Sequence, residues 1–257
     1  MHAVPEGWWH AVANLAPAQG ADLVDGAEPS CGGEEGSANS PAVAVGAQVA
    51  APLEGGRLAV AQAVVPLMES GQTDAAIGLV EAALRSGPDA GSPELHLLRA
   101  DLYIAAAGGG AEGAAAQAVR AYEDTIAAMP TYAQGATQAG AGAAHTSNSP
   151  ATVHLKMGQA LLADGREAEA AATFATAKDL DSGNRNKVKS EALLALAYIE
   201  LNRGDIATGV RRAGAAAAWG AAGARELLAQ VRTKADGLAD TAIVHAVDTQ
   251  LARPLKG

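Results

Sequence analysis

Side chains that can bind metals or act as nucleophiles are few in this sequence and are scattered along it. A zinc site on a helix needs two His residues four positions apart, and other zinc sites need Cys-x-x-Cys pairs. Neither pattern occurs among the six His residues, which are His2, His10, His96, His145, His154 and His245. The single Cys, Cys31, stands in a Gly-rich polar stretch without a neighbouring His or other base to activate its thiol. The sequence therefore predicts no metal site and no cysteine nucleophile.

Patterns typical of phosphate binding and of catalysis by paired carboxylates are also missing. A phosphate-binding loop needs Gly-x-x-x-x-Gly-Lys-Ser/Thr after a strand, whereas the glycines at 108–110 are expected to lengthen a turn. No Gly-x-Ser-x-Gly elbow occurs. The acidic pairs Glu34-Glu35 and Glu123-Asp124 are expected in a solvated tail and on an exposed helix surface. We therefore expect neither a cofactor nor enzymatic activity.

The charge of the chain argues against nucleic-acid binding. The net charge is −10, and binding to phosphates requires clustered Lys and Arg. Residues 1–130 carry 4 basic and 16 acidic residues, and residues 131–257 carry 14 and 12. The basic run Arg185-Asn186-Lys187-Val188-Lys189 is expected to be a solvated loop.

Signals for membranes and secretion are missing as well. No apolar run approaches the roughly 18 to 20 residues that cross a bilayer. The first basic residue is Arg57, so neither the positive start of a secretory signal nor an Arg-rich transit peptide is recognised. We expect a cytoplasmic protein without a membrane partner.

Composition indicates helices throughout. The chain has 66 Ala and only one Phe, and Ala has the highest helix propensity. Residues 1–55 are the exception, because their Gly, Ala, Pro and acidic residues follow no helical or strand period, so we expect a disordered tail. Within it, Trp8-Trp9 either docks into a partner or folds back onto the rest of the chain.

From residue 57 onward, apolar residues recur at helical spacing, and residues 151–184 show this most clearly. Ser149 and Pro150 are typical of a helix start, and Gly165 is expected to separate two helices. The second helix carries three residues spaced four and three apart, so they share one face. They are Ala170, Phe174 and Ala177.

This segment resembles the tetratricopeptide repeat (TPR), a pair of antiparallel helices with a characteristic pattern of small and aromatic residues. Met157-Gly158 matches the Leu-Gly pair of that pattern, and the three residues of the second helix match its Ala, Phe and Ala. Leu161 takes the place of the Tyr, His154 the place of an aromatic residue, and Ser182 the place of the Pro.

Three further segments resemble the same repeat in a degenerate form, namely residues 57–90, 93–130 and 190–221. The resemblance implies an all-α, right-handed helical-repeat solenoid over residues 56–223, with an insertion at 131–150. Ala224 to Lys234 and Asp240 to Ala252 are expected to form capping helices within residues 224–257.

What the resemblance implies about function is a protein-protein interaction scaffold, an adaptor or an assembly factor. Such arrays bind a protein or peptide partner in a groove lined by the first helix of each unit. The expected groove residues here are Leu155, Lys156, Gln159, Leu162 and, in a less certain frame, Tyr198. The chaperone-binding subclass is disfavoured, because the matching face of the first unit offers Ala61 and Val65 instead of Lys or Asn.

Two other functions remain open at this point. In the first, the chain is a structural protein that forms homo-oligomers through its apolar C-terminal helices. In the second, it is an enzyme with an atypical site, which would need polar side chains to converge in a deep pocket.

Overall fold

The structure, a computed structural model, describes residues 56–87, 91–138, 149–184 and 187–255, with the backbone alone at 130–138. Over these residues the protein is all-helical, with ten helices and no strand, as the sequence predicts. The helices are α2 (Gly56–Glu69), α3 (Thr73–Ser86), α4 (Pro93–Gly108), α5 (Ala114–Gln138), α6 (Pro150–Ala163), α7 (Glu167–Leu180), α8 (Val188–Arg203), α9 (Ile206–Ala218), α10 (Ala224–Gly237) and α11 (Thr241–Leu251).

Local sequence fixes where these helices begin and where the chain turns. The hydroxyl of Ser149 accepts a hydrogen bond from the backbone N–H of Thr152 at 3.2 Å, so it caps α6, and Pro150 follows at the first helical position. The carboxylates of Asp205 and Asp240 cap α9 and α11 in the same way. The turns inside the α2–α3, α6–α7 and α8–α9 pairs each use a glycine with positive φ, at Gly71, Gly165 and Gly204.

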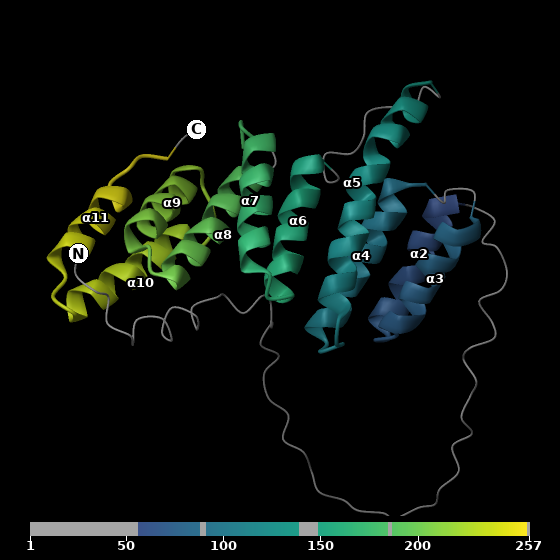
Figure 1. Cartoon of the computed structure of the whole chain (residues 1–257), viewed down its shortest axis with the longest axis horizontal. Coiled ribbons are helices and arrows are strands. Elements are labelled where there is room, and N and C mark those ends of the chain that lie inside the picture. Colours follow the sequence, from purple (N-terminus) through teal and green to yellow (C-terminus); the bar gives the residue numbers. More distant parts are fainter. Residues whose placement is uncertain (1–55, 88–90, 139–148, 185–186, 256–257) are drawn as a thin grey trace, which may run out of the picture.

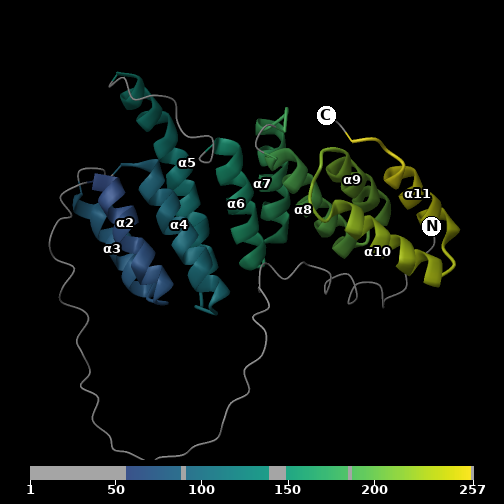
Figure 2. The same ribbon diagram turned by 180° about the vertical axis from the view of Figure 1, so that it is seen from behind.

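The helices pack in a row, each against its neighbours in the chain (Figure 1). We call α2, α4, α6 and α8 the first helices and α3, α5, α7 and α9 the second helices. Successive first helices also contact one another, whereas the second helices do not form comparable contacts. The first helices therefore lie closer together, on one side of the row, and the reverse view shows the same order (Figure 2).

Buried residues recur with the same spacing in successive first helices. The pattern in α4 is Leu95, Leu97, Ala100 and Leu102, and the pattern in α6 is Val153, Leu155, Gly158 and Ala160. Three of these four positions are buried in α8 as well, as Ala192, Ala197 and Ile199. Corresponding positions of α4, α6 and α8 are therefore buried in the same order. This repeated burial accounts for the periodicity of the sequence.

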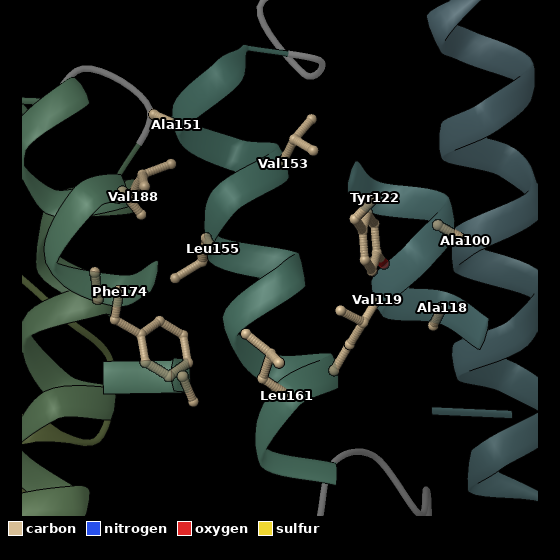
Figure 3. Packing of buried hydrophobic residues seen from close by; sticks show 14 of the residues in the cluster. Ala100, Ala118, Val119, Tyr122, Ala151, Val153, Leu155, Leu161, Phe174 and Val188 are labelled. Carbon is tan, nitrogen blue, oxygen red and sulfur yellow. The ribbon is translucent and has the colours of Figure 1, made fainter. Parts of the chain in front are cut away.

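The core between α6 and α7 depends on a small residue facing a large one. Phe174 is fully buried, and a Cβ atom placed on Gly158 would lie 2.6 Å from its ring. Ala170 and Ala177 on the same face of α7 are fully buried too, as their spacing predicts. On the opposite side of α6, Val153 points toward Tyr122 of α5 (Figure 3), so α6 is packed on both sides.

The last two helices pack differently from the earlier pairs. Both α10 and α11 contact α9, so α11 lies beside the preceding second helix. Gly214 of α9 permits this approach, since a Cβ there would meet the side chain of Gln250. The outward side of α11 exposes polar residues, including Thr241, His245 and Asp248. The sequence predicts one or two helices over these residues, and the structure has two.

Some expectations change or fall outside the described residues. The proposed insertion at 131–150 begins as helix, because α5 continues to Gln138, and residues 139–148 are not described. The prediction that the basic run at 185–189 forms a loop is wrong for Val188 and Lys189, because these two residues belong to α8. The tail at 1–55, with Trp8-Trp9 and Cys31, lies outside the described residues. None of the described helices is both long and apolar enough to cross a membrane.

Replacing Gly158 with Ala should destabilise the protein. The added methyl group would collide with the Phe174 ring, which is enclosed on all sides and cannot move away freely. Gly78 is the matched control, because it lies on the exposed side of α3 with no atom near its Cβ position, so Gly78→Ala should stabilise by about 0.5–1 kcal/mol. The free energies of unfolding of the two variants should differ by about 1–3 kcal/mol in urea titrations.

A second substitution tests the cause. In a Phe174→Leu background the ring is gone, so Gly158→Ala should be less harmful than in the wild-type background. Equal stabilisation by Gly158→Ala and Gly78→Ala would contradict the described packing.

Candidate binding surface

Two ion pairs connect side chains of neighbouring first helices. Lys156 Nζ on α6 donates to Asp101 Oδ2 on α4 at 2.6 Å, and Arg57 on α2 donates to Glu94 on α4 at 3.2 Å. All four side chains are partly exposed. Adjacent first helices therefore turn polar side chains to a common, solvent-accessible side.

We call this solvent-accessible side the first-helix face. Each first helix contributes two residues to it, which are seven positions, or two helical turns, apart. Each is at least partly exposed. They are Leu58 and Val65 on α2, Glu94 and Asp101 on α4, Thr152 and Gln159 on α6, and Glu191 and Tyr198 on α8.

The structure places the predicted groove residues in different environments. Gln159 and Leu162 are exposed, Lys156 is half-buried, and Tyr198 is half-buried on the next first helix. Leu155 is only 5% exposed and points to the side of α6 where Phe174 and Val188 lie (Figure 3). Placing Leu155 on a binding surface was therefore wrong. The helix is covered by α5 on one side and by α7 and α8 on the other, which leaves a narrow exposed stripe.

Asp101 is the centre of a polar network that sequence reasoning missed. Besides Lys156, its carboxylate accepts a hydrogen bond from the Tyr122 hydroxyl on α5 at 2.7 Å, so it joins three helices. Burial and the nearby carboxylate of Asp101 raise the pKa of Tyr122. Tyr122 could have indicated this network in the sequence, since a buried Tyr hydroxyl usually has a hydrogen-bond partner. The ammonium group of Lys156, which was predicted to contact a partner, thus bonds to Asp101 of the same protein.

A second tyrosine links α4 to α3 in a similar way. The Tyr103 hydroxyl donates to Glu81 at 2.7 Å, and burial, with this hydrogen bond, raises the pKa of Tyr103 to about 12. Tyr198 is different, because burial and the nearby charge of Glu226 raise its pKa without such a link between first and second helices. Its ring packs against the C-terminal core.

The described residues contain no group of three or more His, Cys, Asp or Glu side chains placed to hold a metal ion. The glycines at 108–110 end α4 and form the turn before α5, as predicted. Cys31, His2, His10, His145 and the Glu34-Glu35 pair are outside the described residues.

Comparison with known proteins identifies no relative. The sequence matches no protein-family model, and neither curated proteins nor solved structures give a significant match. Inference about function therefore rests on this chain's own residues.

Removing the Asp101 carboxylate should cost more than removing an ordinary surface carboxylate. The substitution Asp101→Ala leaves the hydroxyl of Tyr122, a side chain that is 2% exposed, without its partner. We expect a loss of about 1–3 kcal/mol in the free energy of unfolding. In a Tyr122→Phe background the cost should fall to the roughly 0.2–1 kcal/mol of a surface ion pair.

Glu167 gives a matched control, since it pairs with Arg203 across α7 and α8 at 2.6 Å with similar exposure. The substitution Glu167→Ala should cost no more than about 1 kcal/mol in either background. Equal losses for Asp101→Ala and Glu167→Ala would show that the Tyr122 bond contributes nothing.

Two histidines on the first helices should make stability depend on pH near neutrality. Burial lowers the pKa of His154, and burial together with the Arg99 charge lowers the pKa of His96, against an opposing effect of Asp124. The folded state therefore resists protonation of both rings. As pH falls through about 6.5, the unfolded chain takes up protons first and stability is lost.

Urea midpoints measured between about pH 7.5 and pH 5.5 should fall for the wild-type protein and fall less for His96→Gln/His154→Gln. The control is His245→Gln, which removes an exposed histidine on α11. A double variant with the full wild-type dependence would refute this account.

Proposed function

We propose that this protein is a TPR-like helical-repeat scaffold, with about four degenerate helix pairs in a right-handed solenoid and α10 and α11 capping its end. It acts as a protein-protein interaction adaptor or assembly factor without catalysis. A peptide or protein segment of its partner binds along the first-helix face.

Packing inside the helix pairs supports the repeat assignment. Ala100 on α4 and Ala197 on α8 occupy the register position of Gly158, and both are fully buried. Tyr122 on α5 corresponds to Phe174 on α7. A small residue of the first helix at the level of a large aromatic residue of the second is the feature by which residues 151–184 resemble a TPR, and Ala100 and Tyr122 repeat it in α4 and α5. In the α8–α9 pair the small residue lies on the second helix instead, where Gly209 lies against Leu201 of α8.

The distribution of exposed apolar side chains carries the functional proposal. Large hydrophobic residues exposed within helices are concentrated on the first helices, where Leu58 is 65%, Val65 54% and Leu162 39% exposed. Leu180, the last residue of α7, is the exception among the described helices. Leu58 and Val65 belong to the first-helix face, and Leu162 lies one helical turn after its Gln159. Large apolar side chains in contact with water along this face favour a partner surface there.

Self-association through the C-terminal helices has less support. The outward side of α11 is mostly polar, and Val247 is the buried residue that it contributes to the core. A polar outer surface is typical of a capping element.

The test is partner binding by face variants. The full chain would be used to capture partners, mass spectrometry would identify them, and affinities would be measured with the purified partner. The substitutions Gln159→Lys and Leu162→Asp, combined, should weaken binding by at least about tenfold, since both side chains are exposed on α6.

Leu180→Asp is the matched control, because it changes an even more exposed Leu on a second helix and should leave the affinity unchanged. Circular dichroism would confirm that all variants keep their helices. Undiminished binding by the folded double variant, or equal loss in the control, would overturn the placement of the binding surface. Light scattering over a range of concentrations would separately reveal self-association.

A further inference from the structure

We propose that the α2–α4 end of the first-helix face binds a basic amphipathic segment of the partner. This inference rests on the proposed function and adds the chemistry of the ligand. The proposed site consists of an apolar stripe on α2 and of carboxylates beside that stripe.

The apolar stripe lies on an exposed side of α2, next to its core side. Val60 and Val64 are buried against α3 and α4, whereas Leu58, Ala61 and Val65 are exposed. Leu58 and Val65 are two turns apart, about 10 Å along the helix, with Ala61 between them. A partner helix with apolar residues three, four and seven positions apart can cover such a stripe.

The charges around the stripe accept cations. Glu69 lies one helical turn after Val65 on α2, and Glu94 of α4 bonds to Arg57 beside Leu58, with both carboxylates at least partly exposed. Asp101 lies two turns after Glu94 on α4, where it bonds to α5 and α6. Arg57 and Lys156 are the neighbouring cations, and they already bond to Glu94 and Asp101. A carboxylate can accept more than one hydrogen bond, so further donors can be accommodated, whereas an acidic ligand would meet like charge.

Two rival occupants fit less well. Residues 1–55 precede α2 directly but contain seven acidic residues and no Lys or Arg, so their charge opposes that of the carboxylates. A second copy of the chain would need about 800 Å² per subunit for a stable interface. One face of a 14-residue helix is about 21 Å long and about 10 Å wide, which offers far less area. The face is suited to a single partner segment.

The first experiment uses a defined probe with the full chain. The probe is an end-capped, fluorescent peptide of about 15 residues, with Leu at positions i, i+3 and i+7 and Lys and Ala elsewhere. Its counterpart carries Glu in place of Lys. By fluorescence anisotropy at about 0.15 M salt, the Lys peptide should bind at least about tenfold more tightly than the Glu peptide. Equal affinities, or no binding of the Lys peptide, would overturn the proposal.

Matched variants locate the site. Leu58→Ser/Val65→Ser should weaken binding of the Lys peptide by at least about tenfold, and Glu69→Lys by about threefold or more. Leu180→Ser and Glu123→Lys change exposed residues on second helices and should have no effect. Equal loss in the control variants would mean nonspecific adhesion and would contradict the proposal.

Photo-crosslinking distinguishes the occupants. With a benzophenone amino acid at Val65 of the full chain, the Lys peptide should be the crosslinked species identified by mass spectrometry. Crosslinks to residues 1–55 or to a second copy that the peptide does not displace would overturn the proposal.

The same variants separate this inference from the proposed function. If the captured partner lost affinity on substitution of Gln159 and Leu162 but not on substitution of Leu58 and Val65, the face would bind a partner without using α2. In that case the proposed function would stand and this inference would fail.

Discussion

The close approach of α6 to α7 is the constraint on which the rest of the structure depends. A glycine at 158 lets the Phe174 ring lie against the helix backbone, with Ala170 and Ala177 on the same face of α7. Because the helices pack so closely, both sides of α6 become buried and only a narrow stripe remains exposed. That stripe, repeated on neighbouring first helices, is the surface on which we propose that a partner binds.

Small residues set this geometry along the row, but they contribute little apolar area. Ala dominates the interfaces, and a buried Ala removes much less surface from water than a Leu or Phe. Polar links that join neighbouring helices supplement the packing. Asp101 joins α4 to α5 and α6, and Glu81 joins α3 to α4. The proposed binding face and the stability of the array therefore share residues, of which Asp101 is the clearest example.

Periodicity was enough to predict the helices, because capping residues, turn glycines and apolar spacing are local signals. Ala170 and Phe174 were identified as core residues for the same reason. Leu155 was misplaced because spacing within one helix does not reveal how many neighbours cover it. Asp101 was missed because its partners lie 21 and 55 residues away in the sequence. The sequence could thus predict that the candidate site lies on a face of the first helices, but it could not predict which residues form that face.

Hydrogen–deuterium exchange of the full chain, with and without a captured partner, tests the central claim most directly. Partner binding along the first-helix face should slow amide exchange in α2, α4, α6 and α8 more than in the second helices, since their backbones lie beneath the bound segment. Protection confined to the second helices or to α11 would contradict the account.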